Sequence, residues 1–279
     1  MFIKEGDLVD ITRKNIMYTN FVIKGKQVDN YSKIYFASNE KLDKIFSNVD
    51  IKDKNVLTVL GSGDQAFHLY NRGARHVDVF DKNKLTLFYY YLRRWVIQYL
   101  NTFYPETNLR NIYIKKLLKK VEPRTIEELD AYNYWSEYIN FFEAFNTEKL
   151  LLKSFNYSSN EISDLSIIKK KIEEDDFSFY DFDISGDISL DRKYDIIYKS
   201  NVSDHIAKEK AIFEKYRDNL YDLLEDDGII VSSNVVFKEP SNIERVVFLE
   251  KFDFQMFPGY IHSLNNPPRG YVYKKKMLT

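Results

Sequence analysis

A short apolar run followed by a glycine-rich turn is the clearest local pattern in the chain. Residues 55–60, NVLTVL, are rich in β-branched side chains and leucine, and they end at the Gly-Ser-Gly of 61–63. Residues 64–71, DQAFHLYN, then have the composition of a helix that stops before Gly73. This pattern predicts a strand, a tight turn and a helix, in that order.

Apolar and polar positions then continue to alternate between strand and helix patterns. Residues 76–80, HVDVF, predict a second strand that is closed by Asp81, and 85–103 carry apolar residues at helical spacing. Strands alternating with helices are typical of a mostly parallel α/β sheet with helices on both faces. The other expected elements are a helix over 39–47, strands at 177–182, 194–199 and 229–237, a helix over 207–224, and an antiparallel sheet edge from 245–249 and 271–273.

The middle of the chain interrupts the α/β pattern. Residues 104–175 are rich in Tyr, Phe, Lys and Asn, and their apolar positions recur at helical spacing, which predicts a helical insertion. We therefore expect a nucleotide-binding core of 51–103 and 176–279. Residues 1–50 and the insertion are both expected to close over the site of that core, the insertion as a cap.

Composition excludes several classes of function. The 41 Lys and Arg are balanced by 42 Asp and Glu, so net charge provides no attraction to phosphate backbones and no nucleic-acid partner is expected. Zero cysteines exclude disulfides, thiolate-bound zinc, iron–sulfur clusters and a cysteine nucleophile, and the four histidines form no metal-binding motif. The start, MFIKEGDLVD, lacks a signal-peptide pattern, and no apolar run reaches the ~18 residues of a membrane span. We expect a cytoplasmic protein.

The glycine turn and Asp81 together indicate a nucleoside-binding site. Small residues let a ligand approach the backbone where a helix begins and its N–H groups point outward. Asp81 ends the second strand about twenty positions after Gly61, where an acid can accept hydrogen bonds from a ribose diol. The alternative is an ordinary strand–helix turn with a solvated acid. The agreement of turn, spacing and strand context favours a nucleoside.

The spacing suits both a nicotinamide dinucleotide and S-adenosylmethionine, and two features favour the latter. Asp183 follows the third strand, where a carboxylate can receive an adenine amino group. The fourth strand ends at Ser200-Asn201, in the crevice where open α/β sheets bind ligands. A nicotinamide-dependent oxidoreductase needs a proton donor, and no Tyr-x-x-x-Lys stands in a convincing place. A nucleoside-binding protein without catalysis is the second alternative.

Two stretches, VLTVLGSGDQAFHLYNRGARHVDVFD at 56–81 and YDIIYKSNVSDHI at 194–206, resemble a family of class I S-adenosylmethionine-dependent proteins. This family includes the bacterial diacylglycerol 3-amino-3-carboxypropyltransferases of betaine-lipid synthesis. The segment YSKIYFASNEKLDKIF before the first strand is similar as well. The resemblance implies a Rossmann-like, mostly parallel seven-stranded sheet that binds S-adenosylmethionine.

The resemblance also assigns residues. By position, Gly61, Gly63, Asp64 and Gln65 would line the methionine end of the cofactor, and Asp81 its ribose. The chain departs from ordinary class I methyltransferases at Val59, where they usually carry an acid. The full set of expected cofactor-binding residues is Gly61, Ser62, Gly63, Asp64, Gln65, Asp81, Asn83, Asp183 and Ser200.

Catalytic residues are expected just beyond the fourth strand. Asn201 is placed to orient an acceptor, and His205 or Asp204 to take its proton, because a neutral imidazole accepts a proton near pH 7. The alternative for His205 is a surface residue that caps the next helix. The Asn-Pro-Pro of 266–268 resembles a motif of amino-group methyltransferases, but Arg269 replaces its aromatic residue and the position is wrong.

The sequence thus predicts a transferase that uses S-adenosylmethionine and no metal. The resemblance favours transfer of the 3-amino-3-carboxypropyl group to a small-molecule or lipid-like acceptor, and methyl transfer is the alternative. The motifs do not separate the two reactions, since both use the same cofactor pocket. They identify neither the acceptor nor the oligomeric state.

Overall fold

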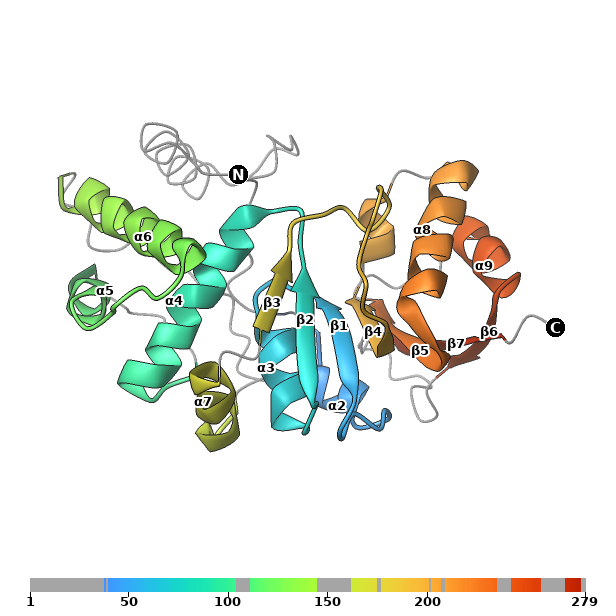
Figure 1. Cartoon of the computed structure of the whole chain (residues 1–279), viewed down its shortest axis with the longest axis horizontal. Helices are drawn as coiled ribbons and strands as arrows, with labels where there is room; N and C mark the ends of the chain where they lie inside the picture. The colour runs from blue at the N-terminus through green and yellow to red at the C-terminus, as the bar shows by residue number, and fades with distance from the viewer. Residues whose placement is uncertain are drawn as a thin grey trace, which may run out of the picture. The chain divides into compact units, whose positions relative to one another are not determined.

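A seven-stranded sheet runs through the computed structural model, which describes residues 38, 40–103, 111–144, 162–174, 177–200, 202–206, 209–234, 242–256 and 269–276 (Figure 1). The strand order is β3-β2-β1-β4-β5-β7-β6. Strands β3 to β5 pair in parallel, whereas β7 is antiparallel to both β5 and β6. The strands are β1 (Asn55–Val59), β2 (His76–Phe80), β3 (Phe177–Tyr180), β4 (Tyr194–Ser200), β5 (Leu224–Asn234), β6 (Phe252–Met256) and β7 (Arg269–Lys275).

The strand order confirms the predicted Rossmann-like arrangement. Strands β1 and β4 are neighbours, and the chain winds outward from them in both directions, so that the order reverses between these two strands. Ligands of such sheets bind beyond the carboxyl ends of the strands at this reversal. The sheet is mixed rather than wholly parallel because β7 inserts between β5 and β6.

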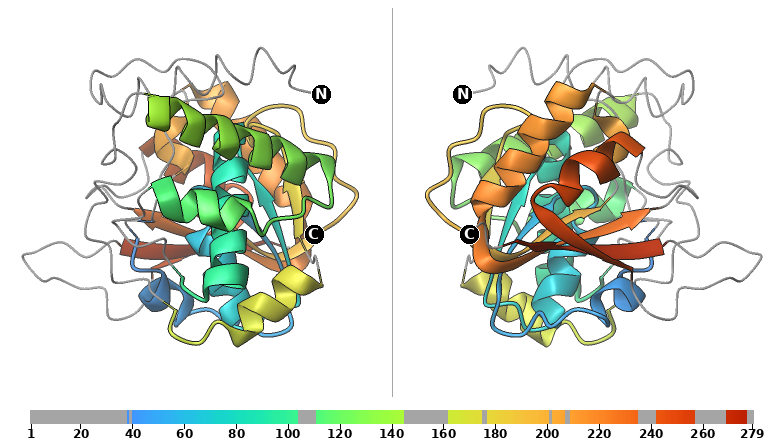
Figure 2. Two further views of the ribbon diagram at one scale, coloured as in Figure 1. Left: turned by 90° about the vertical axis from the view of Figure 1, so that its left-hand side faces the viewer. Right: turned by 90° about the vertical axis from the view of Figure 1, so that its right-hand side faces the viewer.

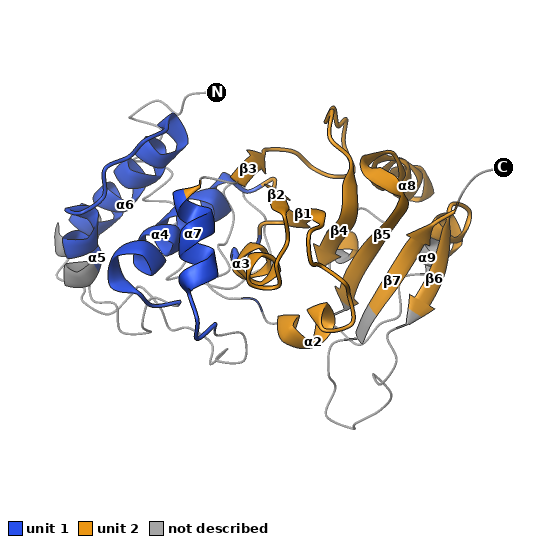
Figure 3. Ribbon diagram, turned by 60° about the horizontal axis from the view of Figure 1, so that its bottom comes forward, with its two compact units in different colours: residues 1–38, 61–63, 83–173 blue, residues 39–60, 64–82, 174–279 orange. Residues whose placement is uncertain are grey.

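The chain divides into two compact units, coloured separately in Figure 3. The first comprises 1–38, 61–63 and 83–173, and the second 39–60, 64–82 and 174–279. The described helices of the first unit are α4 (Lys84–Leu100), α5 (Asn111–Leu118), α6 (Ile126–Ala144) and α7 (Ser166–Glu173). Those of the second are α2 (Leu42–Phe46), α3 (Asp64–Asn71), the 3₁₀ turn η3 (Val202–His205), α8 (Lys210–Leu223) and α9 (Asn242–Leu249).

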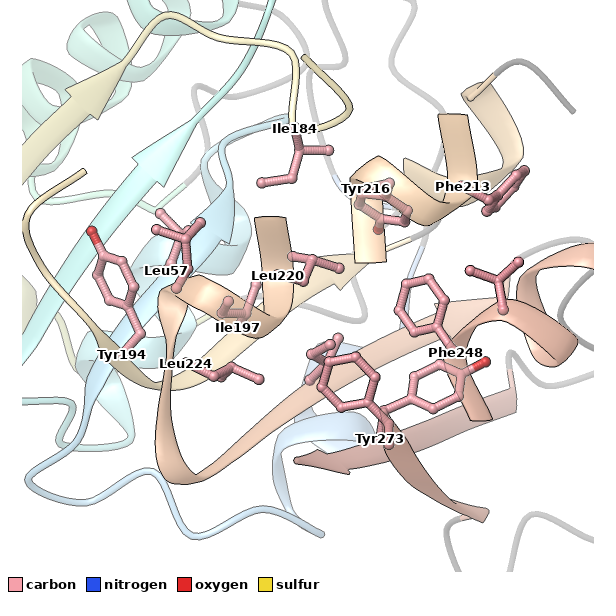
Figure 4. Close-up of a cluster of buried hydrophobic side chains, with 14 of the residues drawn as sticks. Leu57, Ile184, Tyr194, Ile197, Phe213, Tyr216, Leu220, Leu224, Phe248 and Tyr273 are labelled. Carbon is pink, nitrogen blue, oxygen red and sulfur yellow. The ribbon is translucent and has the colours of Figure 1, made fainter. Parts of the chain in front are cut away.

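The second unit has helices on both faces of its sheet. Helices α8 and α9 cover one face, and α2 and α3 lie against the other (Figure 2). Side chains from β4, β5, β7, α8 and α9 form a continuous apolar core on the first face, including Ile197, Tyr216, Leu220, Phe248 and Tyr273 (Figure 4). Burial of these faces supplies the main driving force for folding.

Aromatic packing holds the helices of the first unit together. Trp135 of α6 is 1% exposed, and its indole Nε1 donates a 2.8 Å hydrogen bond to the carbonyl oxygen of Phe88 in α4. The rings of Phe88 and Tyr134 lie 5.3 Å apart between their centres. Burial raises the pKa of the Tyr91 phenol to about 12. Helices α5, α6 and α7 make up most of the described part of the segment 104–175, as its pattern predicts.

One predicted strand is wrong. Residues 245–249 belong to α9, because their burial follows one face of a helix: Val247 and Phe248 are buried while Val246 is 62% exposed. A short apolar run does not distinguish a strand from a helix by itself. The edge strand is instead β6, three residues further on.

The start of one strand also differs from its prediction. Strand β5 begins at Leu224, so Gly228 lies inside it rather than in a preceding turn. The pairing of β4 with β5 shifts register there: Tyr194 pairs with Leu224 and Ile196 with Ile229, so one residue of β4 lies opposite four of β5. A bulge of this kind accommodates the predicted turn residues within the strand. Among the residues that the structure describes, none of the helices has the length and hydropathy needed to cross a membrane.

Candidate functional site

The first strand and first helix of the sheet are joined by a turn that requires glycine. Gly61 and Gly63 have φ angles of 52° and 81°, a left-handed backbone conformation that a residue with a Cβ rarely adopts. The turn connects the end of β1 at Val59 to the start of α3 at Asp64. The predicted strand, glycine turn and helix are confirmed at these residues.

Asp64 and Gln65 begin α3 and are deeply buried, at 0% and 4% exposed. The side-chain Nε2 of Gln65 donates to Oε2 of Glu40 over 3.4 Å. The other end of this amide, Oε1, is buried and has no hydrogen-bond partner within the described ranges. A buried acceptor without a donor is rare in folded proteins and indicates a position where a ligand group can bind.

Asp81 follows β2 at the carboxyl edge of the sheet. The neighbouring strands are in register there, since the backbone N–H of Leu60 donates to the carbonyl oxygen of Phe80 at 2.9 Å. The backbone N–H of Asp81 itself donates to Tyr180 of β3 at 3.2 Å. Asp81 therefore stands at the end of β2, directly beside the end of β1, and ribose binding by it stays a prediction.

Asn83 and Ser62 belong to the first unit, and both are buried. Asn83 precedes α4, and its side-chain Oδ1 accepts a 3.1 Å hydrogen bond from the backbone N–H of Leu85. This contact is a helix N-cap, which stabilises the first turn of α4. The structure thus gives Asn83 a structural role, and cofactor binding by either residue stays a prediction.

Ser200 ends β4 in an unusual conformation. Its φ angle is 52°, in the left-handed region that costs about 1–3 kcal/mol for a residue other than glycine. Its hydroxyl donates to Oε1 of Glu40 at 2.5 Å, and its carbonyl oxygen accepts from the Ser232 hydroxyl at 2.8 Å. Two side-chain contacts therefore hold this backbone turn, which leads into the residues predicted to be catalytic.

Those predicted catalytic residues are only partly described. Asn201 lies outside the described residues. Asp204 and His205 belong to the 3₁₀ turn η3, whose backbone follows the end of β4, but the structure does not describe their side chains. Their roles as acceptor-side groups stay predictions.

Asp183 lies in the loop after β3, three residues beyond Tyr180, rather than at the end of the strand itself. Its carboxylate accepts hydrogen bonds from the Ser185 backbone N–H at 3.0 Å and hydroxyl at 2.7 Å, and Lys82 Nζ lies 3.8 Å away. Partial burial opposes ionisation, but these contacts outweigh it and lower the pKa of Asp183. The carboxylate is thus ionised and locally fixed, and adenine recognition by it stays a prediction.

Glu40 connects several of the predicted residues, and no sequence motif indicates it. Glu40 is 2% exposed and precedes α2. Its carboxylate accepts hydrogen bonds from Gln65, Tyr198, Ser200 and Ser233. These partners come from α3, β4 and β5, so Glu40 brings together the predicted site residues Gln65 and Ser200. Its only signal in the sequence is its place in a segment that resembles the transferase family.

Lys199 was also missed. It is 0% exposed, and its Nζ donates to the hydroxyl of Ser203 in η3. The Nζ lies 5.9 Å from the ring centres of Tyr216 and Phe248 and 5.6 Å from that of Tyr271, within the range of cation–π attraction. A hydrogen bond from a buried lysine thus fixes the turn that carries Asp204 and His205.

Comparison with family models found no match, and neither did comparison with curated proteins. Solved structures similar to this chain include a TehB-like SAM-dependent methyltransferase from Corynebacterium glutamicum, with a TM-score of 0.46 and 11% identity over 96% of this chain and 98% of that one. The N-methyltransferase NodS from Bradyrhizobium japonicum, in complex with S-adenosyl-l-homocysteine, has a TM-score of 0.42 and 8% identity over 96% and 100%. A putative rRNA methylase from Clostridium thermocellum has a TM-score of 0.41 and 11% identity over 86% and 100%.

Proposed function

We propose that this protein is a transferase that uses S-adenosylmethionine. The proposal is carried by two features of the second unit: Asp81 follows β2 beside the end of β1, and the buried amide of Gln65 lies in the first turn of α3. In open α/β sheets the carboxyl edge is where ligands bind.

The residues at this edge fit the parts of S-adenosylmethionine. The Asp81 carboxylate can accept two hydrogen bonds from the ribose diol. Gln65 Oε1, a buried acceptor without a partner in the described chain, suits the ammonium group of the amino-acid end. The backbone N–H groups at the start of α3 suit its carboxylate. We therefore assign the ribose to Asp81, the ammonium group to Gln65 and the carboxylate to the start of α3.

Bound S-adenosylmethionine supplies a carbon that is already activated by the neighbouring sulfonium. The protein therefore has to align the acceptor, exclude water and take up the acceptor's proton. We assign alignment to Asn201 and proton uptake to His205 or Asp204. The contact between Lys199 and Ser203 supports this assignment, because it fixes the turn that carries the latter two residues.

Burial at the start of α3 favours methyl transfer over transfer of the amino-acid chain. Asp64 and Gln65 are almost entirely enclosed, so an amino-acid end held by them lies deep in the protein. A deeply held chain leaves the methyl carbon as the one that faces outward. Transfer of the 3-amino-3-carboxypropyl group is the second candidate, and the resemblance in 56–81 and 194–206 favours it.

The segments outside the core are assigned to the acceptor. We propose that residues 1–50 and the insertion 104–175 close over the site and provide contacts to a small-molecule or lipid-like acceptor. The rRNA methylases among the similar structures make a nucleic-acid acceptor an outcome to test. The balance of 41 basic against 42 acidic residues argues against it.

Calorimetry with the purified protein tests the proposal. S-adenosylmethionine and S-adenosylhomocysteine are expected to bind with micromolar affinity or better, and NAD to bind at least tenfold more weakly. Preferential binding of NAD would instead establish the oxidoreductase alternative. Binding of S-adenosylmethionine without turnover in any extract would indicate a nucleoside-binding protein.

A further inference from the structure

One buried carboxylate connects three elements at the carboxyl edge of the sheet. Oε1 of Glu40 accepts hydrogen bonds from the hydroxyls of Ser200 and Ser233, and Oε2 accepts from the Tyr198 hydroxyl at 2.8 Å and from Gln65 Nε2 at 3.4 Å. A carboxylate has about four positions at which it accepts hydrogen bonds. Four donors from the described residues already occupy this carboxylate, so we expect Glu40 to act on a ligand through its neighbours.

The first consequence concerns the amide of Gln65. This amide has a donor end and an acceptor end, and Glu40 accepts only from the donor end, Nε2. The acceptor end, Oε1, is thereby directed elsewhere, and it is buried without a hydrogen-bond partner in the described part of the chain. A ligand group that donates hydrogen bonds is complementary to this atom, whereas a carboxylate or phosphate is not.

The second consequence concerns Ser200. Its left-handed φ of 52° is held by the hydrogen bond to Glu40 on the side chain and by the Ser232 hydroxyl on the carbonyl oxygen. Strained backbone of this kind persists where the surrounding contacts enforce it, and it is concentrated at functional sites. The same carboxylate thus orients the side chain of Gln65 and holds the backbone conformation of Ser200, where the chain leaves β4.

We propose that Glu40 is a positioning residue that fixes Gln65 so that Oε1 receives the ammonium group of the cofactor's amino-acid end. The inference rests on the proposed function, since it assumes that S-adenosylmethionine binds at this edge. An ammonium group carries three donors and no acceptor, so it matches Oε1 and not Nε2. Glutamine at position 40 would offer both a donor and an acceptor, and the Gln65 amide would lose its fixed orientation.

Two nucleosides separate this role from a general structural one. S-adenosylhomocysteine carries the amino-acid end, and methylthioadenosine has the same adenosine and thioether without it. For Glu40→Gln, calorimetry is expected to show roughly ten- to hundredfold weaker binding of S-adenosylhomocysteine, the scale of one hydrogen bond to a charged group. Affinity for methylthioadenosine should stay within about twofold of the wild type.

Two further variants keep the test valid if Glu40→Gln does not fold. Gln65→Met retains the bulk of the side chain and removes the acceptor, and Ser233→Ala removes one donor to the carboxylate; both are expected to give the same selective loss. Asp50→Asn is the acid-to-amide control, because Asp50 is exposed in the loop that follows α2. It should leave both affinities unchanged, and thermal unfolding measures the stability of every variant.

The outcomes distinguish the two proposals. Selective loss of S-adenosylhomocysteine binding in folded variants supports the positioning role of Glu40. Equal loss of both nucleosides, or no loss of either, overturns that role while leaving the proposed function intact. If neither nucleoside binds the wild-type protein, the proposed function is wrong and the inference is overturned with it.

Discussion

The guanidinium group of Arg93, in the middle of α4, donates a 3.0 Å hydrogen bond from Nη1 to the backbone carbonyl oxygen of Ser62 in the glycine turn. Arg93 is 0% exposed. It also donates from Nη2 to the carbonyl oxygen of Phe103 at 3.3 Å and lies 4.6 Å from the centre of that ring. A buried cation thus fixes the middle residue of the turn that we assign to the cofactor.

Replacing Arg93 by Met should therefore destabilise the protein and loosen the turn. The change removes two hydrogen bonds from a charged donor and leaves the carbonyl oxygen of Ser62 without this partner, which is expected to cost about 2–4 kcal/mol of unfolding free energy. Urea unfolding measures this cost. Binding of S-adenosylhomocysteine should also weaken at temperatures where the variant is folded.

Lys116→Met on α5 is the control for this substitution, because Lys116 is an exposed cation in the same unit. It should change the unfolding free energy by less than about 0.5 kcal/mol. An Arg93→Met protein with wild-type stability would show that the contact to Ser62 does not hold the turn.

Asp81 provides the second prediction, which concerns the ribose. If its carboxylate accepts two hydrogen bonds from the diol, Asp81→Ala should weaken cofactor binding by about 2–4 kcal/mol without unfolding the protein. S-adenosylhomocysteine and methylthioadenosine should lose affinity equally, because both carry the ribose. Asp191→Ala, at an exposed position, is the control. Unchanged affinity in Asp81→Ala would show that Asp81, the strongest residue of the predicted nucleotide-binding motif, does not bind the ribose.

The elements that sequence patterns predicted well are those with local signals. The run of 55–60, the glycines and the start of α3 specify a strand, a turn and a helix through neighbouring residues alone, and all three were found. Residues 245–249 carry no such signal, because RVVFL suits a strand or one face of a helix equally well. Burial against the sheet decides in favour of α9, and burial depends on residues that are distant in sequence.

The same distinction explains why the motif analysis missed Glu40. Its partners Tyr198, Ser200 and Ser233 are separated from it by 158, 160 and 193 residues. No sequence spacing predicts contacts between residues so far apart, and an isolated Glu in a charged segment is expected to be exposed to solvent. The pairing of β4 with β5 brings Tyr198, Ser200 and Ser233 together, and Glu40 contacts them from the segment before α2.

A cluster around Asp78 predicts how stability depends on pH. Asp78 is 0% exposed in β2 and accepts hydrogen bonds from Tyr194 at 2.8 Å and Arg192 at 3.1 Å, with His76 Nε2 at 2.6 Å. Burial alone would raise the pKa of this carboxyl, but the contacts with His76, Tyr194 and Arg192 outweigh it and lower the pKa below 3.8. The folded state therefore binds this proton more weakly than the unfolded state.

The sign of the effect follows from this difference. A carboxyl with a lowered pKa in the folded state stabilises the protein above about pH 4–5, and this contribution is lost as the pH falls below about 4. Asp78→Asn should lower the unfolding free energy by about 1–3 kcal/mol at pH 7. Its deficit relative to the wild type should shrink between pH 5 and pH 3 in urea unfolding, over roughly the window in which the carboxyl titrates. A constant deficit across that range would contradict the lowered pKa of Asp78. Asp50→Asn is the control, because Asp50 is exposed.

The insertion provides a test of closure. If residues 104–175 close over the cofactor and contact the acceptor, limited proteolysis within this range should slow when S-adenosylmethionine is added. NAD at the same concentration serves as the control and should give no protection. Mass spectrometry of the fragments locates the cuts. Equal cleavage with and without S-adenosylmethionine would show that the insertion does not act as a cap.

The last prediction concerns which carbon the acceptor attacks. The attacking atom must approach in line with the breaking carbon–sulfur bond, so the carbon that faces the acceptor reacts. Gln65 is only 4% exposed. If the amino-acid end binds to it, as we propose, that end would be enclosed and the methyl carbon would be the one that faces the acceptor. Incubation with S-adenosylmethionine and cell extract should therefore yield S-adenosylhomocysteine, since the electron pair of the broken bond stays on sulfur. Methylthioadenosine above the level of a protein-free incubation would instead show attack on the amino-acid chain, as the family resemblance favours. That result would mean that Gln65 leaves the γ-carbon accessible, and it would overturn the argument from burial while retaining the cofactor.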